Sequence, residues 1–305
     1  MSGKVWINGK IVDYVDSFFS LGPLHYGTVI FDGILCIARA QKQYFLFRLY
    51  EHINRIFYSA DILRLKVPYT KEELAEIIIN LVRANGYGSY YIRPLIFERK
   101  MYFDIVSNKK EENRNIVILC KKFNSWSFFF HMKKRKVSVM VSKQMKNAWS
   151  EELTLAKISG KYLIYTLARI EAKENSYDEA VILDDKGRVS ETSSSNIFIV
   201  KDSVIKTPLT KNALPGITRA TVIEFAKEIN YQVQEENIFP EDLLNADEIF
   251  LTNSASGIIS VSQIENRKLD KSRQYNIVKI IQNKYIDIIT GRDPSYLRWL
   301  TPIIT

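Results

Sequence analysis

Cysteine, glycine and proline are all scarce in this chain of 305 residues, which has 2 Cys, 12 Gly and 8 Pro. Two cysteines are too few for a disulfide framework and do not suggest a zinc site. Cys36 and Cys120 both lie in apolar runs, so we expect them to be reduced core residues in a reducing compartment. The scarcity of glycine and proline also argues against long linkers and disordered tracts.

Long apolar runs are missing as well. No stretch approaches the roughly 18 apolar residues that a membrane-spanning helix needs, and residues Met1–Trp6 contain no apolar core of a signal peptide. We therefore expect a soluble, cytoplasmic protein without a membrane partner. With 46% hydrophobic residues the chain can bury a large core, and its length predicts about two domains.

The positive charge of the chain is dispersed. A formal net charge of +9 would suit a nucleic-acid partner. However, apart from Lys109–Lys110 and Lys133–Lys136, the cationic residues are scattered, which is typical of a solvated surface. We therefore expect no nucleic-acid partner, and we expect no metal site.

Hydrophobic periodicity predicts a mixed α/β protein. Asn8-Gly9 between two short strands is a strong hairpin signal. Thr70–Glu73 is a capping box in sequence, and Asn85-Gly86 ends the helix that it opens. Pro94 argues against a central strand around it. Strands are predicted at Val5–Ile7, Ile11–Val12, Tyr44–Arg48, Tyr90–Phe97, Ile116–Cys120, Val137–Ser142, Glu179–Asp184, Arg188–Glu191, Asn196–Val200, Val204–Thr207 and Asp247–Thr252, with one more strand that ends near Ala38. Helices are predicted at Leu49–Leu63, Thr70–Arg83, Ile158–Glu174 and Asp270–Thr290, and another begins at Ile217.

The domain organisation follows from these elements. We expect an N-terminal α/β domain over residues 1–122, a linker or lid over 123–134, and a C-terminal domain over 135–305 that carries Lys157. The aromatic residues of the predicted linker could close a pocket between the domains or pack against a partner subunit. In the helix from Ile158, the residues Tyr162, Leu163, Leu167 and Ile170 are at core spacing.

Three features in the second half suit one kind of cofactor. Lys157 precedes a helix among small residues that leave room for a ring, and an apolar pocket would lower the pKa of its amine and free it to form a Schiff base. Glu191 ends a strand and could keep a pyridine nitrogen protonated. Pro215–Thr218 opens a helix whose free amides favour a phosphate. Taken alone, each has an ordinary alternative: a surface lysine, an exposed strand-end glutamate and a common turn.

Two arginines are further candidates for anion contacts. Arg93 lies in the middle of an apolar strand, where it needs a carboxylate from a ligand or from a structural ion pair. Arg55 lies beside the apolar face of a helix, where a snorkelling surface arginine is the alternative.

Taken together and in order, these motifs make the chain resemble the branched-chain amino-acid aminotransferases. That family belongs to a class of pyridoxal-phosphate enzymes that also holds D-amino-acid transaminases and aminodeoxychorismate lyases. The matching segments run nearly from end to end: Trp6–Gly9, Leu24–Thr28, Phe31–Gly33, Glu51–Arg55, Ser59-Ala60, Tyr91–Pro94, Ala156-Lys157, Gly160–Tyr162, Tyr177–Ala180, Ser190-Glu191, Asn196–Phe198 and Leu214–Arg219.

The resemblance implies a two-domain α/β (α+β) fold of fold-type IV, with the cofactor in the cleft between the domains. It implies that Lys157 carries pyridoxal 5'-phosphate as an aldimine and later moves a proton, and that Glu191 holds the pyridinium. The other implied cofactor contacts are Arg55, Ile217, Thr218 and Ser254 at the phosphate, Tyr162 near the phenolic oxygen, and Ser194, Ser195 and Asn196 in the turn after Glu191. The implied substrate contacts are Tyr91, Ser254 and Ala255 for the α-carboxylate, Tyr26, Phe31 and Gly33 for the side chain, and Arg93 and Trp126 at the edge of that pocket.

The implied reaction transfers the amino group of L-leucine, L-isoleucine or L-valine to 2-oxoglutarate, in a homodimer or larger homo-oligomer. The chain departs from the family pattern at several places: Phe31-Asp-Gly-Ile-Leu35 where Phe-Glu-Gly-x-Arg (or Lys) is usual, Lys161 in the usual Gly-Asn-Tyr, Thr192–Ser195 in place of a glycine-rich turn, Asn253 in place of a glycine, and Met145–Ser150 without the usual arginine and proline. Leu35 and the serines leave open another amino donor: a D-amino acid, an aromatic amino acid or an amine. A lyase of the aminodeoxychorismate type and a basic binding module without catalysis also stay open.

Overall fold

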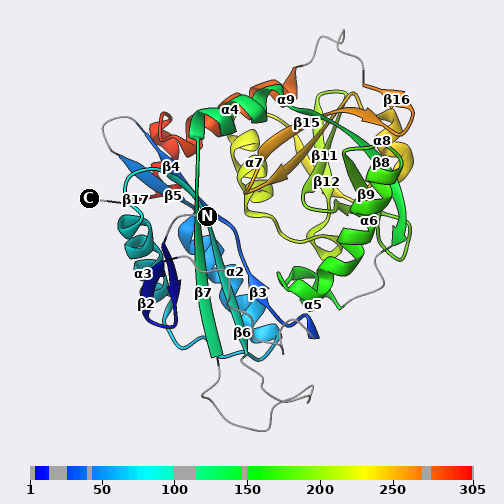
Figure 1. The fold of residues 1–305 in the computed structure, drawn as a ribbon. Coiled ribbons are helices and arrows are strands. Elements are labelled where there is room, and N and C mark those ends of the chain that lie inside the picture. The colour runs from blue at the N-terminus through cyan, green and yellow to red at the C-terminus, as the bar shows by residue number, and fades with distance from the viewer. Residues whose placement is uncertain are drawn as a thin grey trace. The chain divides into compact units, whose positions relative to one another are not determined.

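The computed structural model describes residues 4–13, 26–39, 43–98, 114–145, 150–269 and 276–303. The chain forms two compact units, each with its own β-sheet (Figure 1). The first unit comprises residues 1–125, 156–161 and 288–305, and the second unit comprises residues 126–155 and 162–287. The mixed α/β class predicted from the sequence is confirmed.

The first unit is an antiparallel sheet with two long helices. Its strands are β1 (Lys4–Ile7), β2 (Lys10–Asp13), β3 (Ile30–Phe31), β4 (Ile34–Ala38), β5 (Tyr44–Phe47), β6 (Ser89–Glu98), β7 (Arg114–Phe123) and β17 (Leu300–Ile303), and its helices are α2 (Leu49–Ile62), α3 (Lys71–Ala84) and the short 3-10 helices η1 (Ser159–Lys161) and η3 (Pro294–Trp299). The strand order is β17-β5-β4-β6-β7-β1-β2, and β3 pairs with β6.

Local signals in the sequence account for several of these elements. Asn8 and Gly9 have φ of 44° and 96°, the left-handed turn that joins β1 to β2. The Thr70 side chain accepts from the Glu73 amide and the Glu73 side chain accepts from the Thr70 amide, so the predicted capping box is confirmed at the start of α3. The helix then ends at Ala84, immediately before Asn85-Gly86.

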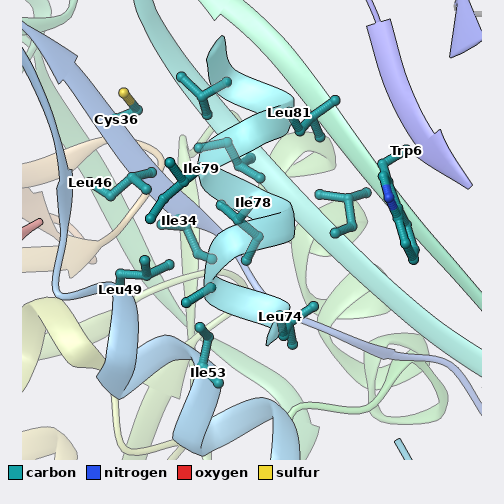
Figure 2. Packing of buried hydrophobic residues seen from close by; sticks show 14 of the residues in the cluster. Trp6, Ile34, Cys36, Leu46, Leu49, Ile53, Leu74, Ile78, Ile79 and Leu81 are labelled. Atoms are coloured by element: carbon teal, nitrogen blue, oxygen red, sulfur yellow. The ribbon is translucent and has the colours of Figure 1, made fainter. Parts of the chain in front are cut away.

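One face of the first sheet packs against α2 and α3. Figure 2 shows Leu49 and Ile53 of α2 and Ile78 of α3 beside Ile34 and Leu46 of the strands. Strand residues enter this core at alternate positions, for example Ile34 and Cys36 in β4 and Tyr90 and Ile92 in β6. Because side chains alternate along a strand, Leu35, Tyr91 and Arg93 extend from the opposite face of the sheet.

Pro94 lies in a central strand, so the expectation of a non-central position is wrong. Strand β6 pairs with β7 on one side and with β3 and β4 on the other. Pro94, which has no amide hydrogen, faces the gap between the end of β3 and the start of β4. Its carbonyl accepts from the Asp32 amide there at 3.2 Å. The proline is tolerated because the sheet needs only an acceptor, and no donor, at this position.

The second unit is a mixed sheet with helices. Its strands are β8 (Lys136–Met145), β9 (Glu179–Leu183), β10 (Val189–Thr192), β11 (Asn196–Lys201), β12 (Val204–Pro208), β13 (Val233–Glu236), β14 (Glu248–Asn253), β15 (Gly257–Ile264) and β16 (Arg267–Lys268). The helices of this part of the chain are α4 (Ser125–Lys134), α5 (Glu151–Leu155), α6 (Tyr162–Glu174), η2 (Thr210–Asn212), α7 (Ile217–Glu228), α8 (Pro240–Asn245) and α9 (Ile277–Ile289). The strand order is β10-β9-β8-β15-β14-β11-β12-β13, and β16 pairs with β15.

Helix α6 forms as predicted, but its buried face is not the predicted one. Leu163, Leu167 and Ile170 are 70%, 41% and 47% exposed. The buried face instead consists of Tyr165, Ala168 and Ala172, which pack against Ala180 and Ile182 of β9 and Met140 of β8. Two alanines let the helix approach the sheet closely, so the larger apolar residues remain outside.

The units do not follow the predicted domain boundaries. Residues 156–161, with Lys157, group with the first unit, and Ile158 forms a bridge with Ile30. The last described residues also join the first unit, because β17 pairs antiparallel with β5. Residues 125–134 of the predicted linker are helix α4.

Some sequence predictions lie outside the described residues. They are the Leu24-His25 part of one motif, Lys109-Lys110, residues 146–149 of the segment before Lys157, and residues 270–275 at the predicted start of the last helix. Within the described ranges, no helix is long and apolar enough to cross a membrane.

Candidate functional site

Lys157 is held by its backbone in the first unit. Its amide donates to the hydroxyl of Ser59 in α2 at 3.0 Å, and its carbonyl accepts from the amide of Phe31 at 3.3 Å. The Nζ atom lies 4.9 Å from the centre of the Phe31 ring. Bonds on both sides of the residue therefore fix the point from which the side chain starts, and an apolar ring flanks the amine.

The small residues after Lys157 pack two backbone segments together. The Gly160 amide and the Ser159 hydroxyl both donate to the Gly27 carbonyl, at 2.7 and 2.6 Å. Gly27 has φ of +65°, and a Cβ atom there would lie 2.8 Å from the Gly160 Cα. The space beside Ser159 and Gly160 that we assigned to an approaching ring is thus filled by another stretch of backbone. Lys161 closes the loop, because its Nζ donates to the Ala156 carbonyl at 3.0 Å.

Arg55 is fixed by a buried carboxylate. Its Nε donates to Asp32 Oδ2 at 2.8 Å and its Nη2 donates to Asp32 Oδ1 at 2.6 Å, a two-bond contact that holds the plane of the guanidinium. His52 Nδ1 donates to the same Oδ1 at 2.8 Å, and the Gly33 amide donates at 2.6 Å. Asp32 is the residue at the usual glutamate of the family motif. Arg55 is therefore not a snorkelling surface residue.

The charges in this cluster follow from burial. Burial alone would raise the pKa of the Asp32 carboxyl, but Arg55 and the bond from His52 hold it well below its usual range. Burial lowers the pKa of His52, and the Asp32 carboxylate opposes that shift only in part. A neutral His52 that donates from Nδ1, an ionised Asp32 and a charged Arg55 are the consistent state at neutral pH.

Arg93 and Tyr91 lie side by side in β6. Arg93 Nη2 donates to Tyr91 Oη at 3.1 Å, and the guanidinium lies 5.4 Å from the Phe31 ring and 5.3 Å from the Tyr91 ring. A Cβ atom at Gly33 would lie 2.0 Å from Tyr91 Oη, so the tyrosine needs a glycine there. Arg93 Nε is buried without a hydrogen-bond partner among the described residues. The arrangement suits an anion bound from outside the chain.

Leu35 places hydrocarbon where the family motif has a cation. It is buried in β4 and lies opposite Tyr91 in the register of β4 and β6. On this face of the sheet the first unit thus has Arg93 as a cation, whereas the family motif predicts a second cation at position 35.

Glu191 lies buried in the second unit and has a tyrosine as its partner. Tyr165 Oη donates to Glu191 Oε1 at 2.7 Å, and the Tyr165 and Tyr162 rings meet edge to face at 5.2 Å. Burial and the neighbouring carboxylate raise the pKa of Tyr165 well above its ordinary value, so the hydroxyl remains a donor. Sequence reasoning missed Tyr165. The signal was its position three residues after Tyr162, in line with Ala168 on the buried face.

The start of α7 is a place for an anion. The residue before the helix is Gly216, so no side chain caps the amides of Ile217 and Thr218. Asn196 holds this turn: its Nδ2 donates to the Leu214 carbonyl at 2.8 Å, and its Oδ1 lies only 1.9 Å from where a Cβ atom at Gly216 would be. Uncapped amides and the helix dipole favour a phosphate or carboxylate here.

The serine turn after Glu191 is bonded to the protein itself. The hydroxyls of Ser193 and Ser194 donate to the buried Glu179 carboxylate at 2.5 and 3.1 Å, and Arg169 forms an ion pair with the same carboxylate. Sequence reasoning missed Glu179, although Tyr177–Ala180 was one of the matching segments.

The turn between β14 and β15 presents two more amides. Asn253 Oδ1 accepts from the Ser256 amide at 2.7 Å, and Asn253 Nδ2 donates to Ser195 Oγ at 2.7 Å. The amides of Ser254 and Ala255, at the tip of the turn, donate to no described residue. They are available to an anion.

Two predicted substrate residues are less firmly placed. Trp126 in α4 is 74% exposed and stacks on Phe130, with ring centres 5.5 Å apart. Tyr26 is half-buried immediately before Gly27. Over the described ranges, no group of three His, Cys, Asp or Glu side chains is arranged to hold a metal ion.

The predicted site residues therefore form two groups. The first-unit group comprises Tyr26, Phe31, Gly33, Arg55, Tyr91, Arg93 and Lys157, and the second-unit group comprises Trp126, Tyr162, Glu191, Ser194, Ser195, Asn196, Ile217, Thr218, Ser254 and Ala255.

Comparison with known proteins covers both groups. The model of the family described as amino-transferase class IV matches residues 30–264. The branched-chain-amino-acid aminotransferase of Escherichia coli strain K12 is 33% identical over 304 residues, which are 98% of this chain and 97% of that protein. A putative branched-chain-amino-acid aminotransferase of Methanocaldococcus jannaschii is 36% identical, over 94% of this chain and 96% of that protein.

Solved structures show the same likeness in three dimensions. The Escherichia coli branched-chain amino acid aminotransferase superposes with a TM-score of 0.92 at 32% identity, and all of both chains is covered. The branched-chain amino acid aminotransferase of Thermobaculum terrenum in its PLP-form has a TM-score of 0.89 at 26% identity, with 100% of this chain and 99% of that chain covered.

Proposed function

Because the chain belongs to the class IV aminotransferases, we propose that it transfers the amino group of L-leucine, L-isoleucine or L-valine to 2-oxoglutarate, with pyridoxal 5'-phosphate as cofactor. Two relatives that it matches over nearly their whole length are named as branched-chain-amino-acid aminotransferases, one of them as putative. The similar Thermobaculum terrenum enzyme was solved in its PLP-form.

The residues present fit this cofactor. Uncapped amides at Ile217 and Thr218 suit its phosphate, a buried carboxylate at Glu191 suits its ring nitrogen, and Lys157 supplies an amine beside an aromatic ring. We assign Arg55 and Ser254 to the phosphate as well. Tyr162 is assigned to the phenolic oxygen, and the turn with Ser194, Ser195 and Asn196 to the support of Glu191.

When bound, pyridoxal phosphate supplies an electron sink for the charge left at the substrate Cα. The amine of Lys157 would take the proton from the substrate Cα and hold it for return during the exchange, which is general acid–base work by one group. The Glu191 carboxylate would accept a hydrogen bond from the ring nitrogen and so keep that nitrogen protonated. Tyr165 donates to Glu191, so it orients the carboxylate.

The same groups account for two kinds of substrate. The amides of Ser254 and Ala255 and the Tyr91 hydroxyl receive the α-carboxylate that both substrates share. Phe31, Gly33 and Tyr26 accept an apolar side chain, while Arg93, with Trp126 at the edge, receives the second carboxylate of glutamate. The buried Nε of Arg93, which has no partner among the described residues, supports that role.

One observation carries the proposal most directly. Lys157 is clamped by its backbone to Phe31 and Ser59, in the same unit as Arg55, Tyr91 and Arg93. A surface lysine at a helix start needs no such clamp.

A different amino donor is the second candidate, favoured by the buried Leu35. Because position 35 has no cation, Arg93 alone would bind the second carboxylate of a dicarboxylate substrate on this face of the sheet. A D-amino acid, an aromatic amino acid or an amine then becomes the alternative donor, and a lyase of the aminodeoxychorismate type becomes the alternative reaction.

We further propose that the enzyme works as a homodimer or larger homo-oligomer in the cytoplasm. Association is supported by an exposed apolar stripe on α6, which consists of Leu163, Leu167 and Ile170. A second subunit could bury this stripe and remove it from water. The free thiols of Cys36 and Cys120 support a reducing compartment.

The proposed function is tested by absorbance and by a panel of donors. The purified protein with pyridoxal phosphate is expected to absorb visible light and to lose that band on addition of L-leucine, L-isoleucine or L-valine. D-alanine, an aromatic amino acid and a simple amine are the comparison donors. A protein that binds no cofactor would contradict the proposal, and a response to one of the comparison donors alone would favour the second candidate.

A further inference from the structure

Two positions at which the chain departs from its family are bonded to each other in the second unit. Asn253 stands where a glycine is usual, and Ser195 belongs to the serine version of a turn that is usually rich in glycine. Asn253 Nδ2 donates to Ser195 Oγ at 2.7 Å. Each of these side chains therefore has a partner that a glycine at the other position would remove.

The backbone gives no reason for a glycine at position 253. Asn253 is the last residue of β14, pairs with Gly257 in the register of β14 and β15, and is not among the described residues with positive φ. The residue that does need glycine is Gly257, with φ of +67° and Met132 Sδ at 2.4 Å from the place of a Cβ atom. The side chain of Asn253 is consequently an addition to the turn and not a replacement for backbone freedom.

The asparagine side chain bridges the turn in both directions. Its Oδ1 accepts from the Ser256 amide at 2.7 Å, which closes the turn around Ser254 and Ala255. Its Nδ2 fixes the same turn to Ser195, which directly precedes β11, the strand paired with β14. Both polar ends of the amide are thus used, so the side chain has one favoured orientation.

Ser195 is itself rigid. Its backbone amide donates to Thr192 Oγ1 at 3.1 Å, and its carbonyl accepts from the Thr192 amide at 2.8 Å. Thr192 follows Glu191 directly in β10. A short chain of bonds therefore connects the carboxylate proposed for the ring nitrogen to the amides proposed for the α-carboxylate.

We propose that Asn253 and Ser195 act as a positioning pair, which holds the Ser254 and Ala255 amides in the orientation that receives the α-carboxylate of the amino donor. The inference rests on the proposed function for the role of those amides. Neither residue of the pair needs to touch the substrate. The pair keeps the turn closed, so that the amides are aimed before the substrate arrives.

The pair is tested by three variants in the cofactor-loaded enzyme. Asn253→Gly restores the residue usual in the family, Ser195→Ala removes only the hydroxyl, and the third variant carries both changes. Asn253→Gly is expected to raise KM for the amino donor about five- to tenfold, with kcat within about twofold, because the turn loses both hydrogen bonds of the Asn253 side chain while the proton-transfer groups stay in place. By the same reasoning Ser195→Ala is expected to raise KM about threefold.

The double variant distinguishes a pair from two separate contributions. If the residues act through each other, the double variant is no worse than Asn253→Gly alone, since Ser195 has already lost its partner. Multiplicative effects on KM would overturn the proposal, and so would an Asn253→Gly enzyme with unchanged KM. Asn175→Gly is the control: it makes the same asparagine-to-glycine change outside the β14–β15 turn, removes the bond from Nδ2 to the Glu171 carbonyl, and is expected to leave KM unchanged.

Hydrogen exchange separates this inference from the proposed function. In the wild type we expect slow exchange of the Ser256 amide, which donates to Asn253 Oδ1, faster exchange of that amide in Asn253→Gly and Ser195→Ala alike, and no change in Asn175→Gly. A wild type without any transaminase activity would overturn the proposed function, and the exchange result would still show whether the pair holds the turn. Unchanged exchange in Ser195→Ala would overturn the pair in either case.

Discussion

The two groups of site residues are built by different physical means. The first-unit group uses charged and aromatic side chains, and its cation Arg55 is fixed by a fully buried carboxylate, Asp32. The second-unit group also has a buried carboxylate, Glu191, but its places for an anion are backbone amides at the start of α7 and in the β14–β15 turn. A charged side chain must be prevented from moving, whereas an amide must be kept without an internal partner. The stabilising contacts of the two groups accordingly lie in different places.

This difference predicts different results for substitutions at the two kinds of group. Changes at the buried Asp32–Arg55 pair of the first unit should disturb folding and chemistry together, because Ser59 bonds to both Arg55 and Lys157, the lysine proposed to hold the cofactor. Changes around the backbone amides of the second unit should alter binding with smaller effects on stability, because hydrogen bonds to backbone are replaced more easily by water.

The largest effect is expected at Lys157. Lys157→Ala removes the amine that we propose moves the proton, so kcat should fall by about a thousandfold or more, as for other general acid–base groups. The second-unit group is intact in this variant, so cofactor should still bind, with weaker affinity. Steady-state kinetics and equilibrium dialysis measure the two effects. Lys173→Ala, at an exposed position of α6, is the control and should behave as the wild type.

Two buried glutamates on neighbouring strands give the next test. Glu191→Gln replaces the carboxylate proposed for the ring nitrogen by an amide, and kcat should fall about a hundredfold with little change in the free energy of unfolding. Glu179→Gln weakens the bonds to Ser193, Ser194 and Arg169, and should lower stability more than kcat. Kinetics and urea unfolding of both variants test this contrast. Equal losses of kcat would show that Glu191 has no special part in the chemistry.

Asp32 should matter for stability and for phosphate. Asp32→Asn leaves Arg55 as a buried cation without its carboxylate, which costs about 3–5 kcal/mol in the free energy of unfolding. The affinity for pyridoxal phosphate should fall too, because the guanidinium is no longer held in one plane. Asp32→Glu, the usual residue of the family motif, should be milder in both measurements. An Asn variant as stable as the wild type would contradict the role given to this ion pair.

Leu35 tests the substrate preference that we assign to residues of the first unit. Leu35→Arg introduces a second cation on the sheet face of Tyr91 and Arg93, so KM for 2-oxoglutarate should fall by about tenfold, the effect of one charge-assisted contact. KM for L-leucine should rise or remain unchanged. Kinetics with both substrates check the split. Leu35→Met, which keeps the apolar character, is the control. No gain with 2-oxoglutarate would mean that another group already meets its second carboxylate.

The smallest expected effect is a pH dependence of stability at His52. The pKa of His52 is lowered by burial, whereas in the unfolded chain it is about 6.5. Below about pH 6.5 the unfolded chain therefore binds a proton that the folded chain excludes, and the free energy of unfolding should fall by at most about 1.4 kcal/mol per pH unit. His52→Asn keeps a donor to Asp32 and should lose this slope. Urea unfolding between about pH 7 and pH 5 spans the ordinary histidine pKa and measures the slope. Identical slopes in both proteins would refute the assignment.

Much of this architecture could be predicted from local sequence signals. The Asn8-Gly9 turn, the Thr70–Glu73 capping box and the hairpin of β11 and β12 depend on residues close together in the chain, so the sequence pattern predicted them correctly. The predicted buried face of α6 was wrong because the helical spacing of large apolar residues was taken as a sign of burial. Ala168 and Ala172 are buried because their small side chains allow α6 to approach β8 and β9 closely. This depends on the shape of the sheet surface, which the periodicity of the helix sequence does not reveal.

The site shows the same limit. Lys157 and Glu191 could be singled out as residue types in suitable places, but their neighbours come from distant parts of the chain. Asp32 meets Arg55 across 23 positions, Tyr165 meets Glu191 across 26, and Ser195 meets Asn253 across 58. Such partners follow from strand register and helix rotation, which are fixed only when the sheet has formed. For the same reason Lys157 groups with the first unit although its position in the sequence places it in the second half.

The most direct test of the account is to locate the cofactor on the chain. The wild-type protein loaded with pyridoxal phosphate is reduced with borohydride, digested and analysed by peptide mass spectrometry. We expect a phosphopyridoxyl label on Lys157 and none on Lys161, the neighbouring buried lysine that bonds to the Ala156 carbonyl. A label on any other lysine, or no stoichiometric label at all, would contradict it.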